Sequence, residues 1–229
     1  MLIGGISDWY ATVLTPAVEL IDHFVGQVEP QIAHAYNQYE TGRKSYLAVD
    51  DVSDGQQFAQ EVERYGNLDS MGWNMKALFE EHFPNLQRRS VLMTVYSSFE
   101  SELFELCALF QVEKRLTIGA SDLSGQGIFQ AQNYLEKVAR LDVHRGSAEW
   151  AKLNHLRIIR NMIVHREGKL LDSTDERFKK EMKAITALKF IEASEGEILL
   201  EPGFLPEAVR AFELYFKLID NSIQKTYPR

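Results

Sequence analysis

The chain has 229 residues, of which 45% are hydrophobic and 25% charged, the balance of a globular protein with a substantial core. Its net charge of -8 argues against a general nucleic-acid coat protein, and its single cysteine excludes a disulfide within the chain. That cysteine, Cys107, lies in the apolar run "FELCALF", so we expect a buried thiol in a protein of a reducing compartment.

The N-terminal segment is unlike a secretion signal, because it lacks a basic start and Asp8 interrupts its apolar stretch. No run of about 18 apolar residues occurs in the sequence, so we expect no membrane span. The expected location is therefore the cytoplasm.

We expect residues 1–80 to form an acidic helical extension packed on the rest of the chain. Its first 70 residues hold 11 acidic and 3 basic side chains. Residues 15–40 predict one or two helices, with Pro16 near a start and Pro30 at a kink or break. Residues 50–73 are polar and interrupted by glycine, which favours loops with short helices.

The helix signal strengthens at Pro84. Apolar residues then recur at intervals of three and four, the spacing of one helix face: Leu92, Tyr96, Phe99, Leu103, Leu106 and Phe110. The segment "SDLSGQG" predicts a loop, and residues 128–141 predict a further helix. Ser147 is placed as the N-cap of the next helix, which ends near Gly168.

The C-terminal part predicts a helix, a hairpin and a closing helix. Residues 173–176, "STDE", have the spacing of a capping box. Residues 188–202 alternate around a Ser-Glu-Gly turn, and residues 205–223 are amphipathic. We therefore expect an all-α fold, in which residues 81–229 form an up-and-down helical bundle with one small β-hairpin before the C-terminal helix.

The stretch "LRIIRNMIVHREG", residues 156–168, carries polar side chains through an aliphatic helix. Helical spacing places four of them along one stripe: Arg157, Arg160, Asn161 and His165. An apolar stripe runs beside it: Leu156, Ile159 and Ile163. Residues 137–169 hold eight Lys or Arg and three Asp or Glu, a local charge of +5, so any polyanion that binds is expected to bind here.

The sequence "RNMIVH" resembles the Arg-polar-x-x-x-His motif of HEPN-domain ribonucleases. The helix "LMTVYSSFESELFELC", with its Phe99-Glu100 pair, is similar to the helix that precedes the motif in that family. The resemblance covers residues 85–226 and implies a HEPN-like bundle that forms a two-fold homodimer. It further implies that the dimer cuts RNA without a metal, by attack of the ribose 2′-hydroxyl on the adjacent phosphate, in a toxin or phage-defence setting.

The residue types suit this chemistry. An imidazole is suited to acid–base catalysis, so His165 can move the proton of the 2′-hydroxyl or of the leaving oxygen. Arg160 can stabilise a phosphate that gathers negative charge, and Asn161 can orient His165. We assign Glu100 a supporting role in orienting Arg160 or His165. Four basic residues are assigned to the RNA backbone: Arg157, Arg166, Lys152 and Lys169.

The sequence departs from one variant of the family and leaves an alternative open. Toxins paired with nucleotidyltransferase antitoxins commonly carry a tyrosine two residues after the motif histidine, where this chain has Glu167. An antitoxin or defence-system partner stays a candidate. We expect no metal and no cofactor, since His144 and His155 lack partners at metal-ligand spacing. The alternative function is a non-catalytic HEPN-like dimerising module, whose acidic N-terminal part docks a basic partner.

Overall fold

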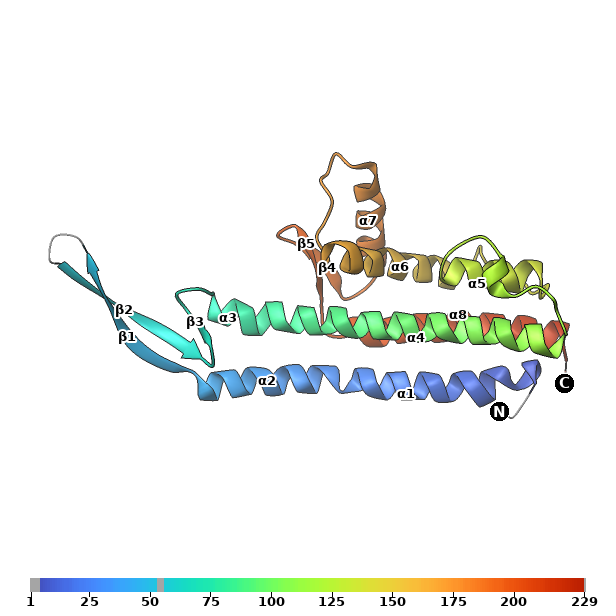
Figure 1. The fold of residues 1–229 in the computed structure, drawn as a ribbon, viewed down its shortest axis with the longest axis horizontal. Helices are drawn as coiled ribbons and strands as arrows, with labels where there is room; N and C mark the ends of the chain where they lie inside the picture. Colours follow the sequence, from blue (N-terminus) through green and yellow to red (C-terminus); the bar gives the residue numbers. More distant parts are fainter. Residues whose placement is uncertain (1–4, 53–55, 229) are drawn as a thin grey trace. The chain divides into compact units, whose positions relative to one another are not determined.

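The computed structural model describes residues 5–52 and 56–228 (Figure 1). The chain divides into two compact units. The larger unit combines Met1–Val25 with Arg89–Arg229, and the smaller unit is Gly26–Arg88. The first 25 residues of the sequence therefore belong to the same unit as the motif helix.

The larger unit is helical apart from one hairpin, in which β4 pairs antiparallel with β5. Its elements are the 3-10 helix η1 (Ile6–Asp8), the π-helical turn η2 (Tyr10–Leu14), α1 (Thr15–Gly26), most of α4 (Phe83–Glu113), the 3-10 helix η4 (Ala120–Asp122), α5 (Ile128–Lys137), α6 (Ala148–Arg166), α7 (Glu176–Ala187), β4 (Ile191–Ser194), β5 (Glu197–Leu200) and α8 (Phe204–Thr226). Within residues 5–52 and 56–228, no helix combines the length and apolar character needed to cross a bilayer.

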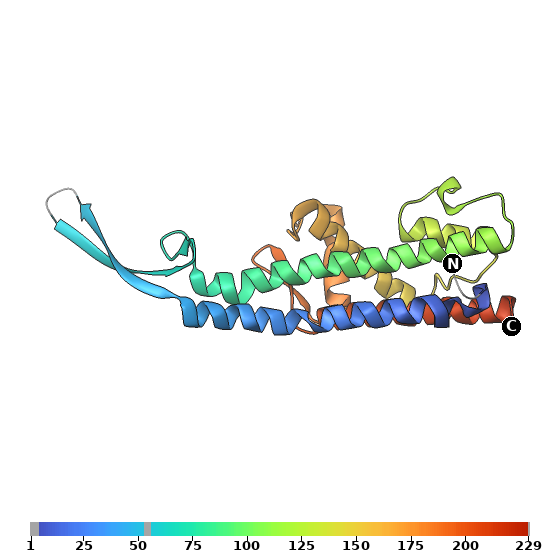
Figure 2. The same cartoon turned by 60° about the horizontal axis from the view of Figure 1, so that its bottom comes forward.

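The core of the larger unit lies where α4 and α8 pack together (Figure 2). All six apolar residues predicted to share one face of α4 are buried, which confirms that prediction, and Cys107 is also buried, as expected. Phe99 of α4 stacks on Phe212 of α8 with ring centroids 4.6 Å apart. Trp9 meets the edge of Phe216, at 5.6 Å, and so joins the N-terminal segment to the same core. Such aromatic pairs contribute about 0.5–1.5 kcal/mol beyond the burial of their area.

The motif helix α6 begins and ends as its sequence predicts. The side chain of Ser147 accepts a hydrogen bond from the backbone N–H of Trp150, at 3.0 Å, and so caps the first turn. At the other end, Glu167 and Gly168 adopt left-handed φ angles of 55° and 80°. A Cβ at Gly168 would lie 2.7 Å from the guanidinium carbon of Arg89, so glycine is required there on two counts.

The smaller unit joins helices to a three-stranded antiparallel sheet. Its elements are α2 (Val28–Gly42), β1 (Lys44–Val52), β2 (Gln56–Tyr65), β3 (Leu68–Asp69), the short helix α3 (Met75–Ala77), the π-helical turn η3 (Leu78–His82) and the start of α4. The strand order is β1-β2-β3, with Lys44 opposite Arg64. Tyr39 of α2 stacks on Phe79 of η3, at 4.1 Å, and Tyr65 of β2 packs its edge against both rings. These rings form the aromatic core of the unit.

The prediction of an all-α fold is wrong, because β1 and β2 occupy most of the region for which we expected loops and short helices. The physical reason is visible in β1, where the neighbouring residues Tyr46 and Leu47 are both exposed. Successive residues of a strand point to opposite faces, so a ribbon that is solvated on both faces lacks the apolar-polar alternation by which strands are recognised. The hairpin expected within residues 188–202 is present as β4 and β5.

Candidate functional site

The buried and accessible faces of α6 decide which motif side chains can reach a ligand. Its buried row steps by three residues: Trp150, Leu153, Leu156, Ile159 and Met162. Leu156 and Ile159 therefore belong to the core as predicted, whereas Met162 takes the place expected for Ile163, which is only partly buried. On the other side, Arg160 is half-buried and His165 is exposed. The motif thus reaches the protein surface.

A cavity of about 740 Å³ is lined by residues of α4, of α6 and of the loop that leads into α5. We call it the Glu100 pocket. Its lining includes Tyr96, Glu100, Gly125, Gly127, Phe129, Arg157, Arg160 and Asn161. The fold therefore brings Glu100, Arg160 and Asn161 to one cavity, although 60 positions separate the first two in the sequence. The volume lies within the range of about 300–1,000 Å³ that is typical of small-molecule sites.

Two arginines of the pocket lie over aromatic rings and form no ion pair among the described residues. Arg160 lies over the ring of Tyr96 and Arg157 over the ring of Phe129, with guanidinium carbons 5.8 and 4.9 Å from the ring centroids. The Nε atoms of both are buried without a hydrogen-bond partner. No ion pair involves either arginine in the described part of the chain, and Arg160 donates a hydrogen bond to Asn161 Oδ1 at 3.2 Å.

Glu100 contributes the negative charge of the same cavity. Burial raises the pKa of this half-buried carboxyl above its ordinary value, and the nearby charge of Arg160 opposes that rise. Among the described residues, Glu100 has neither a hydrogen-bond partner nor an ion-pair partner. Gly127 approaches it closely, because a Cβ built there would lie 2.7 Å from Glu100 Oε1. The carboxylate is thus half-buried and lies close to the turn at Gly127.

His165 lies outside the Glu100 pocket, in a neighbouring hollow of about 390 Å³ that we call the His165 pocket. Its lining includes Ile158, Asn161, Met162, His165, Leu171 and Lys180. Asn161 lines both pockets, so it is the residue that connects the two halves of the motif. One copy of the chain therefore presents Arg160 and His165 in adjacent cavities rather than in one.

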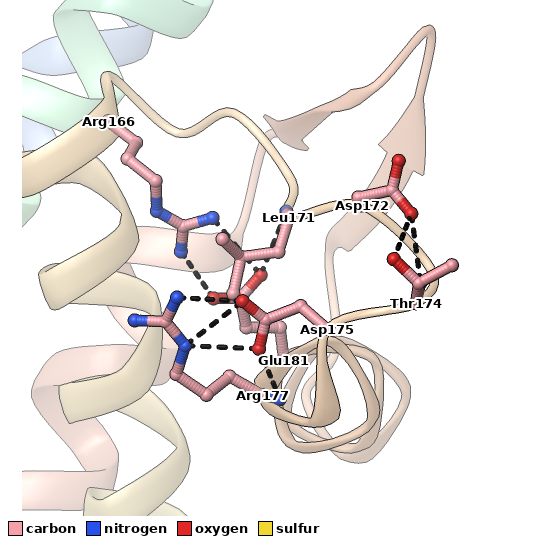
Figure 3. Close-up of polar contacts among 7 residues, drawn as sticks. All are labelled: Arg166, Leu171, Asp172, Thr174, Asp175, Arg177 and Glu181. Atoms are coloured by element: carbon pink, nitrogen blue, oxygen red, sulfur yellow. Dashed lines mark hydrogen bonds and ion pairs between the residues drawn. The ribbon is translucent and has the colours of Figure 1, made fainter.

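Several charged residues that line the His165 pocket are paired with one another or with neighbouring carboxylates (Figure 3). Arg166 forms an ion pair with Glu181, which is 6% exposed and also accepts a hydrogen bond from the backbone N–H of Leu171 at 3.3 Å. Arg177 forms an ion pair with Asp175 at 2.7 Å, and Asp175 caps α7 through the backbone N–H of Arg177. These bonds hold the segment between α6 and α7 against α6.

The four residues assigned to the RNA backbone fall into two groups. Arg166 pairs with Glu181, and Lys152 pairs with Glu207. Arg157 and Lys169 form no ion pair within the described residues. A charge without a carboxylate partner is the better phosphate ligand, because binding does not first require an internal pair to be broken.

Sequence reasoning missed several lining residues. Tyr96 had been placed only as a core residue, and "SGQG" only as a loop, although Gly125 and Gly127 line the Glu100 pocket. These glycines have positive φ angles of 121° and 58°, in a turn that no local sequence motif predicts. Phe129 and Lys180 carry no motif in the sequence, and only the tertiary fold brings them to the cavities.

Comparisons with models of protein families, with curated proteins and with solved structures find no match to this chain. Over residues 5–52 and 56–228, no three His, Cys, Asp or Glu side chains gather in a group that could hold a metal ion. The case for a function therefore rests on the residues of the two pockets.

Proposed function

We propose that the chain is a HEPN-type endoribonuclease that cuts RNA at a site shared by two copies of the protein. The observation that carries the proposal is the accessibility of the motif. Arg160 and Asn161 line one cavity, His165 lines the next, and neither Arg160 nor His165 has a carboxylate partner among the described residues. A motif whose purpose was structural would be expected to pair these charges within the chain.

The reaction assigns a role to each motif residue. One His165 takes the proton of the ribose 2′-hydroxyl as its oxygen attacks the adjacent phosphorus, and the second copy's imidazole gives a proton to the leaving 5′-oxygen. Arg160 stabilises the charge that develops on the phosphoryl oxygens. Asn161 holds Arg160 through the observed hydrogen bond. The products are a 2′,3′-cyclic phosphate and a 5′-hydroxyl.

We infer the homodimer from the separation of the two cavities. Because Arg160 and His165 line different pockets of one chain, a second copy is the simplest source of the group that each pocket lacks. Val164, next to His165, is 46% exposed and offers an aliphatic contact for a partner helix. A two-fold arrangement of α6 helices would also supply two imidazoles, one as base and one as acid.

The test is cleavage of labelled tRNA and mRNA by the purified protein in excess EDTA. We expect His165→Ala to lower the rate about 10²- to 10⁴-fold, the usual contribution of a general acid or base. His23→Ala is the matched control, because His23 is an exposed histidine of α1 outside both pockets. Equal activity of His165→Ala and the unchanged protein would contradict the proposal.

A mixing experiment tests the shared site. Arg160→Ala and His165→Ala proteins should each cut RNA far more slowly than the unchanged protein. A mixed dimer of the two keeps one Arg160 and one of the two imidazoles, so we expect it to recover part of the lost activity. Cleavage by the mixture above that of either variant alone supports a site built from two chains. No recovery, in a mixture shown to exchange subunits, would mean that each chain carries its own complete site.

The smaller unit favours a second candidate, a module that binds another protein. On β1, Leu47 and Val49 are 71% and 55% exposed. Apolar side chains in a solvated ribbon of two long strands are typical of a surface that meets a partner. In that case Arg160→Ala and His165→Ala would change assembly or stability, and neither would change the cutting of RNA.

A further inference from the structure

Most of the residues that line the Glu100 pocket have no role in the proposed cleavage. Arg160 and Asn161 are two of the residues that line the cavity, and the transfer of protons needs only His165. Its lining also includes Glu100, Phe129, Arg157 and the Gly125–Gly127 turn. A cavity of about 740 Å³ beside the reacting phosphate has room for a nucleotide.

We infer that the Glu100 pocket binds a guanine base of the RNA, with the Glu100 carboxylate accepting hydrogen bonds from the N1–H and 2-amino groups. The inference deepens the proposed function and rests on it, since it names the nucleotide that lies beside the cleaved bond.

The arginines favour a flat, unstacked base. The guanidinium groups of Arg157 and Arg160 lie over the rings of Phe129 and Tyr96. Single-stranded RNA is commonly recognised by stacking its bases on aromatic rings or on arginine planes. The two positive charges also suit the phosphates that flank the base, because the described part of the chain places no carboxylate in an ion pair with either.

Glu100 favours a base with two adjacent donors. Its carboxylate is half-buried and has no hydrogen-bond partner among the described residues, so a ligand that donates to both oxygens replaces hydration lost on burial. The Watson–Crick edge of guanine presents an N–H and an amino group side by side. Adenine and cytosine present one amino group beside a ring acceptor, which a carboxylate oxygen repels. The N3–H of uracil lies between two carbonyl acceptors.

Gly127 supports a fixed position for the carboxylate. Its φ of +58° brings the turn so close that an added Cβ would lie 2.7 Å from Glu100 Oε1. Any other residue at this position would force the carboxylate or the turn to move. Glycine thus lets the backbone form one wall of the cavity beside the Glu100 carboxylate.

The test measures binding of 5′-GMP, 5′-AMP, 5′-CMP and 5′-UMP to the full-length protein by calorimetry. We expect GMP to bind at least about tenfold more tightly than the others, the discrimination typical of one bidentate contact to a base edge. Glu100→Gln should remove most of that preference, because an amide offers one acceptor and presents a donor to the second group of guanine. Glu105→Gln, an exposed change of equal charge on α4, should leave it unchanged.

A second pair of variants guards against a misfolded result. Gly127→Ala should weaken GMP binding, whereas Gly146→Ala, where nothing lies within 4 Å of the added Cβ, should not. Equal affinities for all four nucleotides, or a Glu100→Gln protein that keeps the preference for GMP, would overturn the inference. Nucleotide binding needs no cleavage, so the two proposals fail separately. A protein that prefers GMP but cuts no RNA would contradict the nuclease alone.

Discussion

The middle and the C-terminal end of α6 both carry arginines, but only the arginine at the end forms an ion pair among the described residues. In the middle, Arg157 and Arg160 have aromatic neighbours and no carboxylate partner among the described residues. At the end, Arg166 pairs with the buried Glu181, which also holds the backbone of the following turn. Arginines that lie close together in the sequence can therefore have two different roles. An arginine paired with a buried carboxylate stabilises the fold, whereas an unpaired arginine at a cavity remains available to a ligand.

The largest expected effect is on the rate of RNA cleavage, and it should differ between Arg160→Ala and Arg166→Ala. Arg160→Ala should lower the rate of RNA cleavage about 10²- to 10³-fold, as loss of one group that stabilises transition-state charge commonly does. Its effect on the free energy of unfolding should be about 1 kcal/mol, between the values of an exposed and of a desolvated contact with an aromatic ring. The measurements are initial rates in EDTA and urea denaturation.

Arg166→Ala should give the reverse pattern, with the larger loss in stability and the smaller loss in rate per folded molecule. If Arg166→Ala abolished cleavage in a protein of unchanged stability, the division between the two ends of α6 would be wrong. Arg210→Ala, an exposed arginine of α8, serves as the control for loss of charge.

The second effect concerns Glu181. Glu181→Ala leaves Arg166 without its partner and the backbone N–H of Leu171 without its acceptor. Breaking a fully buried ion pair costs about 3–5 kcal/mol. The Arg166 side chain is 28% exposed, so we expect about 2–3 kcal/mol, measured as a lower midpoint of urea denaturation. A change below about 0.5 kcal/mol would mean that the cluster in Figure 3 contributes little to the fold.

The third effect is on RNA affinity, and it should be larger for Arg157, which forms no ion pair among the described residues, than for Lys152, which pairs with Glu207. In a His165→Ala background that cannot cut, Arg157→Ala should weaken binding of single-stranded RNA by about 1 kcal/mol, fivefold in Kd. The slope of log Kd against log salt should become shallower by about 0.7, the value for one phosphate contact. Lys152→Ala removes a charge already paired with Glu207, so its slope should stay close to the unchanged protein's. Equal slopes for both variants would contradict this distinction.

The helix that carries the motif was predictable because its signals are local. Ser147 caps its first turn, Gly168 follows its last residue, and the apolar seam of α4 lies in the core as spaced. The strands of the smaller unit were not predictable, since β1 exposes consecutive apolar residues and so lacks a two-residue period.

The candidate site was predictable only in part. Glu100, Arg160 and Asn161 do line one cavity, but His165 lines another, which helical spacing alone does not reveal. Glu181 lies 15 residues beyond Arg166, so a count of charges along the sequence treats Arg166 and Arg157 alike. The difference between a structural and an available cation is a property of tertiary contacts.

The smallest expected effect separates two roles for Glu100. Burial raises the pKa of Glu100 above its ordinary value of 4.5, so the folded protein binds this proton more tightly than the unfolded chain does. Ionisation of Glu100 therefore costs stability as pH rises through the folded-state pKa. The free energy of unfolding of the unchanged protein should therefore fall, relative to that of Glu100→Gln, as the pH rises from 4 to 7. The fall should be smaller than the loss expected for Glu181→Ala. Thermal melts of both proteins across that range, with Glu19→Gln as an exposed control, measure the difference.

The sign of that difference is informative. A Glu100→Gln protein that is more stable at pH 7 indicates a carboxylate kept at a cost, as expected of a group that awaits a ligand. A less stable variant would mean that attraction to Arg160 exceeds the cost of burial. Glu100 would then act by orienting Arg160, and the middle of α6 would resemble its paired end more closely than the absence of an ion pair suggests.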